Sequence, residues 1–113
     1  MATEVRVTTT VAKVLRVFLE DASQPRYGFE LMRLAGLPSG TLYPALARLE
    51  SVGWLSSYRE DVDPVAEGRP PRRFYRISEK GAREARCELT ALSEQLRPPT
   101  PLLSRVHPRW EPA

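Results

Sequence analysis

Cysteine, histidine and long apolar runs are nearly or wholly missing from this 113-residue sequence. Its one cysteine, Cys87, cannot form an internal disulfide, so we expect a reducing compartment. No stretch approaches the ~18–20 apolar residues that a membrane span needs, and the first residues lack the pattern of a signal peptide. The single histidine, His107, has no second ligand near it in the sequence. We therefore expect a soluble cytoplasmic protein with no metal and no cofactor.

Patterns that indicate catalysis are missing as well. The sequence has no nucleophile–base constellation, no phosphate-binding glycine loop and no cluster of metal ligands. We therefore expect no catalytic residues and no enzymatic activity.

Positive charge is the most informative property of the composition. Seventeen Lys and Arg against fourteen Asp and Glu give a net charge of +3, and the pI is about 9.4. Four arginines fall between positions 69 and 76, and four acids lie between 60 and 67. The balance fits a nucleic-acid partner, and the 42% hydrophobic content is enough for one modest core.

Apolar residues at helical spacing predict three helices in the first half of the chain. The first follows the hydroxyl residues Thr8–Thr10, which are suitable N-caps, and Pro25 marks its end. Its apolar stripe is Val11, Val14, Leu15, Phe18 and Ala22. A short second helix fits residues 27–35, and a turn at 36–38 leads into a third helix over 39–52. Two helices joined by a short glycine-containing turn match the helix-turn-helix motif.

The third predicted helix has two different faces. Its apolar stripe consists of Leu42, Ala45, Leu46 and Leu49. Its other face consists of Gly40, Tyr43, Pro44, Ala47, Arg48 and Ser51. A solvated helix face is usually rich in Glu and Lys, so this composition predicts close approach to another surface. Small residues in front with an arginine behind them suit a helix that enters a DNA major groove.

The start of the third helix is ambiguous because Pro44 lies near it. If Thr41 is the N-cap, Pro44 falls in the first turn, where its missing N–H would be unpaired anyway. If Ser39 is the N-cap, the bond to Gly40 is lost and the first turn is distorted. The sequence leaves both possibilities open, and Gly53 is expected to close the helix.

Two β-strands and a long loop follow the third helix. Residues 54–59 and 72–78 read as strands, and the twelve residues 60–71 between them, with Gly68 and three prolines, are too many for a tight turn. A helix-turn-helix followed by a long-looped hairpin predicts a winged helix, a mainly α fold with a small β-hairpin. Strand periodicity places Arg72 and Arg73 on opposite faces, so not every arginine can reach the same partner.

A last helix is predicted over residues 79–97, with Ser78 as its N-cap. Its apolar residues are Ala82, Ala85, Leu89, Leu92 and Leu96, at heptad spacing. They can pack on the first helix or on a second copy of the chain. We expect Ala85, Leu89, Leu92 and Leu96 to serve dimerisation. The predicted organisation is a winged helix-turn-helix domain over 1–78 with its wing at 60–71, a dimerisation helix over 79–97, and a Pro-rich tail over 98–113.

Several strings of this sequence resemble the PadR-like transcriptional regulators. They are YGFEL at 27–31, SGTLYPAL at 39–46, RLE at 48–50, GWL at 53–55 and GRPPRRFYRISEKG at 68–81. The similarity covers roughly residues 11–97, and the Gly-Thr-Leu-Tyr-Pro string is a specific mark of the family. The resemblance implies a winged-helix homodimer that binds a palindromic operator in double-stranded DNA, usually as a repressor. It also implies that a phenolic acid or a flat hydrophobic molecule is a possible effector, although only one short helix follows the wing here.

Candidate DNA-binding residues come from the helices and from the wing. They are Tyr27, Ser39, Gly40, Thr41, Tyr43, Pro44, Arg48, Arg69, Arg72 and Arg73. Arg48 suits a phosphate, and Tyr43 has the alternative of packing against the domain. The wing arginines have the alternative of forming a solvated charged loop. Two other functions stay open: a protein-interaction module whose basic surface meets an acidic partner, and a regulator gated by an aromatic molecule at the dimer interface.

Overall fold

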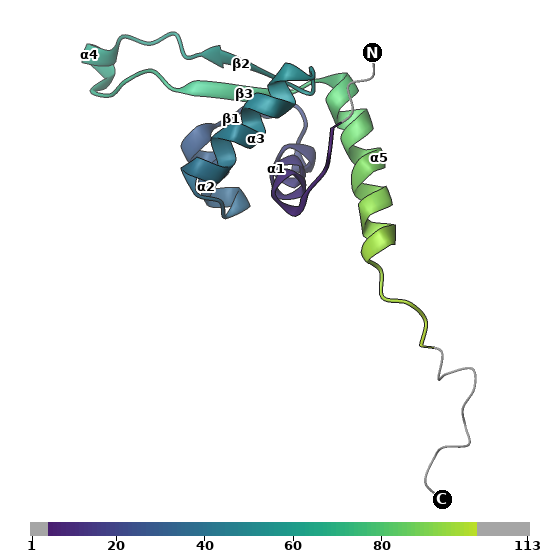
Figure 1. Ribbon diagram of the computed structural model, residues 1–113. Coiled ribbons are helices and arrows are strands. Elements are labelled where there is room, and N and C mark those ends of the chain that lie inside the picture. The colour runs from purple at the N-terminus through teal and green to yellow at the C-terminus, as the bar shows by residue number, and fades with distance from the viewer. Residues whose placement is uncertain (1–4, 102–113) are drawn as a thin grey trace, which may run out of the picture.

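Three helices and a small antiparallel sheet form the body of the chain, and a longer helix extends away from it (Figure 1). The computed structural model describes residues 5–101, so His107 and most of the predicted tail over 98–113 lie outside the described residues. In chain order the elements are α1 Thr9–Glu20, β1 Arg26–Tyr27, α2 Gly28–Ala35, α3 Ser39–Ser51, β2 Leu55–Arg59, α4 Pro64–Glu67, β3 Arg73–Ile77 and α5 Glu79–Leu96.

The first helix begins where its hydroxyl cap predicts. Thr8 Oγ1 accepts a hydrogen bond from the Val11 N–H (3.2 Å), which satisfies one of the unpaired donors of the first turn. The apolar stripe is buried as expected, except that α1 ends at Glu20. Ala22 therefore lies outside the helix, contrary to the prediction, although it still packs partly against the core, and Val17 takes a buried position in the helix.

The sheet has three strands in the order β1–β3–β2, one more than the predicted hairpin. β1 is only two residues long and pairs Tyr27 with Phe74, while β2 pairs Tyr58 with the other edge of Phe74. A two-residue strand has no period, so the sequence offered no signal for β1. Its consequence is that the start of α2 is tied to the hairpin.

The third helix begins at Ser39 with Pro38 as its N-cap, so neither predicted cap was right. The Pro38 carbonyl accepts hydrogen bonds from the N–H groups of Thr41 (3.0 Å) and Leu42 (2.9 Å). Pro44 therefore lies well inside the helix, and because it has no N–H, the Gly40 carbonyl lacks its usual i+4 donor. α3 is held by its buried leucines against α1, α2 and β2, which offsets that loss.

A Schellman motif ends the third helix. Gly53 has a φ of +80°, its N–H donates to the Glu50 carbonyl (3.1 Å), and the Trp54 N–H donates to Leu49 (3.0 Å). Trp54 and Leu49 are both core residues, so the chain turns directly from α3 into the sheet.

The wing is a long hairpin that projects from the sheet on the side opposite α5 (Figure 1). β2 and β3 pair from Leu55 with Ile77 out to Arg59 with Arg73. The loop predicted over 60–71 contains a short helix, α4, at the tip of the wing, which was not predicted from the sequence. Asp63 caps this short helix and Pro64 occupies its first position, where a missing N–H costs nothing.

The last helix is buried at its start and exposed at its end. Ser78 caps α5 by accepting from the Gly81 N–H (2.9 Å), and it donates to the Gly53 carbonyl (2.7 Å). Ala85 was predicted to contact a second copy of the chain. It is instead fully buried in the core of the single chain, so it is not available for that contact. Leu96, by contrast, is 70% exposed. Within residues 5–101, no helix is both long and apolar enough to cross a membrane.

Candidate nucleic-acid interface

One face of α3 is open to solvent along its whole length. Its exposed side chains include the predicted contacts Ser39, Gly40, Thr41, Tyr43, Pro44 and Arg48. The first turn has no acid, and Arg48 forms no ion pair with any residue that the structure describes. The fold thus brings together hydroxyls, small side chains and one free cation on a single surface.

Tyr43 packs against the domain, which is one of the two alternatives that the sequence left open, and it is also partly exposed. Its ring end lies over the backbone of Gly28, where an added Cβ would be 2.8 Å from Tyr43 Cζ. The same side chain is 43% exposed. α2 and α3 therefore approach each other closely at Gly28, and Tyr43 packs on the domain while part of it still faces solvent.

A cleft of about 790 Å³ lies between the start of α2, α3 and the base of the wing. Its lining combines aromatic rings with arginines and prolines: Tyr27, Gly28, Phe29, Tyr43, Arg69, Pro70, Pro71, Arg72, Arg73 and Tyr75. Burial raises the pKa of Tyr75 above its usual value of 10.0. The cleft therefore offers cations and hydrogen-bond donors, which suit an anionic partner.

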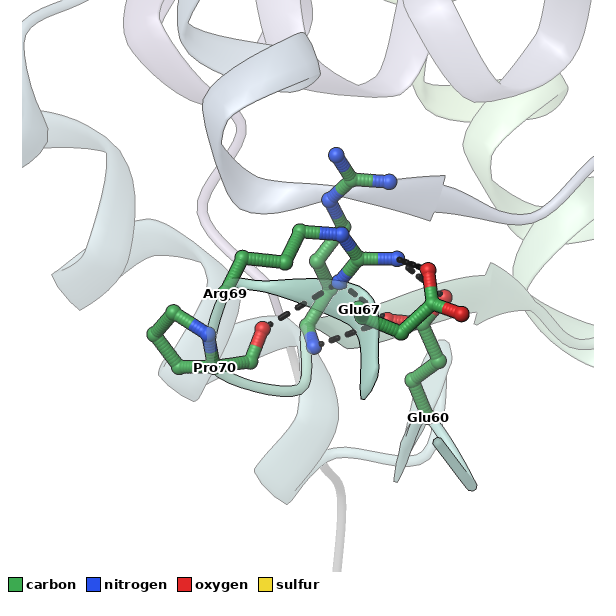
Figure 2. Close-up of polar contacts among 5 residues, drawn as sticks. Glu60, Glu67, Arg69 and Pro70 are labelled. Atoms are coloured by element: carbon green, nitrogen blue, oxygen red, sulfur yellow. Dashed lines mark hydrogen bonds and ion pairs between the residues drawn. The ribbon is translucent and has the colours of Figure 1, made fainter. Parts of the chain in front are cut away.

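Arg69 is engaged inside the wing. Figure 2 shows its guanidinium facing Glu60, with Nη1 2.7 Å from Oε1 and Nη2 3.2 Å from Oε2. Glu67 lies 3.8 Å from the same guanidinium, and the Pro70 carbonyl accepts from Nη1 (3.2 Å). A bidentate pair of this kind fixes geometry as well as charge. Arg69 thus braces the wing, and its guanidinium is engaged within the wing.

Glu60 is the residue that sequence reasoning missed. Beyond its bond to Arg69, its Oε1 accepts from the Arg72 backbone N–H (3.1 Å), and its own N–H donates to the Arg72 carbonyl (2.8 Å). These bonds, first the one from Arg69 and then the one from Arg72, lower the pKa of the Glu60 carboxyl below its usual 4.5. In the sequence Glu60 is one of four clustered acids, and nothing distinguishes it from the other three.

We expect Glu60 to make the wing acid-sensitive. A carboxyl whose pKa is lowered on folding stabilises the folded state above its unfolded pKa, and that contribution is lost as pH falls through the lower, folded value. Glu60→Gln should therefore melt below the parent at pH 7, with the difference shrinking below about pH 4.5. Glu67→Gln is the matched control, because its pair is longer and more exposed. Thermal melts from pH 7 to pH 3 measure both, and a Glu60→Gln deficit that does not change with pH would contradict the assignment.

The other two predicted wing arginines are held differently. Arg73 Nη1 donates to Ser57 Oγ (2.8 Å), and Ser57 in turn donates to Glu50 Oε2 (2.6 Å). The Arg72 guanidinium stacks over the Tyr27 ring, with Cζ 4.6 Å from the ring centroid. Neither forms an ion pair within residues 5–101, and no group of three potential metal ligands occurs among those residues. The two guanidinium groups thus add positive charge to the surface beside α3.

A helix-turn-helix with an open third helix, a sheet and a projecting hairpin defines a winged-helix domain. The sequence profile described as "Transcriptional regulator PadR-like family" matches residues 14–87. The chain therefore belongs to the PadR-like family, which consists of transcriptional regulators and not enzymes. No curated protein matches this chain.

Solved structures agree with this assignment. Reduced AbfR of Staphylococcus epidermidis, bound to DNA, is 25% identical with a TM-score of 0.63, over 80% of this chain and 60% of that one. AbfR in its disulfide form is 26% identical, with the same TM-score and coverage. A transcriptional regulator homologue from Pyrococcus horikoshii OT3 shares the fold at 20% identity and a TM-score of 0.62, over 76% of this chain and 78% of that one. The present chain thus spans 60% of the length of AbfR.

Proposed function

We propose that this protein is a homodimeric regulator, acting as a repressor, that binds a palindromic DNA operator through α3 and the base of its wing. The observation that carries the proposal is the exposed face of α3, which has no acid before Glu50 and lies beside a cleft rich in arginine. The DNA bound by the similar regulator AbfR supports the choice of partner.

In this proposal α3 reads the bases. The helix opens with Ser39, which has a small side chain, and Gly40, which has none, and this permits close approach to a groove. The Thr41 hydroxyl can donate to or accept from a base edge. The N-terminal end of a helix also favours a phosphate. Arg48, one helical turn beyond Pro44, takes a backbone phosphate.

The wing contributes charge near its base rather than at its tip. Arg72 and Arg73 lie where the hairpin leaves the sheet, while Asp61, Asp63 and Glu67 surround the tip. A negatively charged tip is repelled by phosphates. The proposed wing contact is therefore made by Arg72 and Arg73.

Dimerisation is assigned to the exposed part of α5. Leu89 packs partly against the core, and Leu92 and Leu96 continue the same stripe beyond it. A two-fold pair through this stripe would present two recognition helices to half-sites ~34 Å apart, one turn of DNA.

The two other functions considered from the sequence differ in support. A protein-interaction module with an acidic partner would bind DNA weakly and without sequence preference. Enrichment of one DNA sequence from a random pool would therefore exclude this alternative. An aromatic effector stays a prediction. A cavity of about 660 Å³ beside Trp54 has room for a small molecule, although Arg6, Glu84 and Glu88 line it together with Val5, Val7 and Cys87.

Selection from a random duplex pool tests the proposed function. We expect the protein to recover an inverted repeat and to bind it at nanomolar to sub-micromolar concentration. Affinity should fall steeply between about 50 and 200 mM salt because bound arginines displace phosphate counterions. A pool that shows no enrichment, together with an affinity that does not depend on salt, would refute the proposal.

Helix and wing variants should then behave differently on the selected site. Thr41→Ala is expected to reduce the preference for that site over random DNA by about 1–3 kcal/mol, as for a lost base contact. Arg73→Ala should weaken binding to both sequences by a similar factor, since a phosphate contact carries no sequence information. Lys80→Ala, which removes one exposed charge from α5, is the control. Equal losses on both sequences from Thr41→Ala would exclude base reading by this residue.

A further inference from the structure

We infer that Tyr27 is a positioning residue, whose ring orients the Arg72 guanidinium toward a DNA phosphate. This inference rests on the proposed DNA binding, and it changes the role expected for Tyr27 from a direct contact to an indirect one. A chain of side-chain contacts supports it: Tyr58 in β2 contacts Phe74 in β3, Phe74 contacts Tyr27 in β1, and the Tyr27 ring contacts Arg72.

The face of the Arg72 guanidinium is covered by a ring, while its edge is free. Cζ lies 4.6 Å from the centre of the Tyr27 ring, which is cation–π geometry. No hydrogen bond or ion pair engages the Arg72 side chain anywhere in the part of the chain that the structure describes. The guanidinium N–H groups lie in the plane of the group, so a stack on one face leaves them available to a phosphate.

The backbone of Arg72 is fixed independently of its side chain. Its carbonyl accepts from the Glu60 N–H (2.8 Å), and its own N–H donates to Glu60 Oε1 (3.1 Å). Arg69 holds that carboxylate in a bidentate pair (2.7 and 3.2 Å). The pair of Arg69 and Glu60 therefore fixes the position of the Arg72 backbone.

The Tyr27 ring is in turn held by neighbouring rings. It packs edge-on against Phe74, with centroids 5.6 Å apart, and Phe74 stacks on Tyr58 at 5.7 Å. The three residues are directly paired across β1, β3 and β2. Tyr27 also serves as the N-cap of α2. The ring is thus supported by Phe74, and it provides a platform for Arg72.

A fixed guanidinium matters because a free arginine side chain has many rotamers to lose on binding. Stacking removes most of that freedom before DNA arrives, so more of each phosphate contact appears as affinity. Tyr27 and Arg72 should therefore act as one unit, and removing either should remove the same contact.

The test measures binding of a short duplex of mixed sequence over a range of salt. Arg72→Ala should lower the slope of log affinity against log salt by about one for each bound chain. Tyr27→Leu should lower the slope almost as much and weaken binding about two- to fivefold per chain. The double variant should be no worse than Arg72→Ala, and Tyr27→Phe, which keeps the ring, should retain the parent slope. Arg83→Ala on α5 is the charge control and should leave the slope unchanged.

A spectroscopic measurement tests the stack without DNA. Protons held over an aromatic ring resonate upfield, so the Arg72 side-chain signals should be shifted in the parent and in Tyr27→Phe but not in Tyr27→Leu. If Tyr27→Leu does not fold, Phe74→Leu, which removes the support of the ring, should reduce both the shift and the slope. Parent signals without the upfield shift would overturn the inference.

The outcomes separate the inference from the proposed function. A parent protein that binds DNA with a salt slope, together with a Tyr27→Leu variant that keeps the parent slope, would overturn the positioning role alone. A parent protein that does not bind DNA would refute the proposed function. An Arg72→Ala variant with the parent slope would show that Arg72 meets no phosphate, and this too would overturn the inference.

Discussion

Leu92→Glu combined with Leu96→Glu should yield a folded monomer that binds a half-site only weakly. Leu92 and Leu96 lie beyond the buried start of α5, and Leu96 is 70% exposed, so the single chain loses little packing. In a dimer, burial of each leucine would contribute about 1.5–3 kcal/mol, and a charge placed in that contact is costly without a partner. Sedimentation gives the oligomeric state, and titration of the selected palindrome gives the loss of affinity.

Two other substitutions on the same helix provide the matched control. Ala91→Glu with Gln95→Glu adds the same charge at exposed positions away from the leucine stripe. This double variant should remain dimeric and should bind the palindrome nearly as tightly as the parent protein. A parent protein that sediments as a monomer at tens of micromolar would refute the dimer, and α5 would then need another role.

Gly81→Ala should destabilise the fold by about 2–3 kcal/mol, because there is no space for a methyl group. Gly81 is buried in the first turn of α5, and an added Cβ would lie 2.7 Å from Trp54 Cα and still closer to the Trp54 carbonyl oxygen. Both atoms belong to the backbone, which cannot rotate away as a side chain can. α5 would have to shift off the end of β2, and chemical denaturation measures the cost.

The same substitution at another helical glycine should have the opposite sign. An added Cβ at Gly40 meets nothing within 4 Å, so Gly40→Ala should raise stability by about 0.5–1 kcal/mol through the lower entropy of the unfolded chain. If α3 enters a groove as proposed, the added methyl group should also weaken operator binding. A Gly81→Ala variant as stable as Gly40→Ala would contradict the close approach of α5 to Trp54.

Local patterns in the sequence determined most of the secondary structure and the family. The stripes of α1 and α3, the hydroxyl caps at Thr8 and Ser78, and the alternation along β3 each depend on residues close together in the chain. Apolar periodicity and helix caps act over one or two turns, so they can be recognised without a structure. The strings that resemble the PadR-like regulators are local in the same sense, and the family profile over residues 14–87 confirmed the family that they predict.

Only the tertiary structure decided how the arginines of the wing are used. Strand periodicity separates Arg72 from Arg73 but names no partner for any of the three arginines, and in the structure Arg69 pairs with Glu60, Arg72 stacks on Tyr27 and Arg73 donates to Ser57. Those partners lie nine to forty-five positions away and come from two different strands, β1 and β2, or from the residue that follows β2. The burial of Ala85 and the short strand β1 were likewise decided by contacts across the fold. A side chain's role here depends on which distant residue reaches it, and that is set by the packing of the sheet on the helices rather than by its neighbours in the chain.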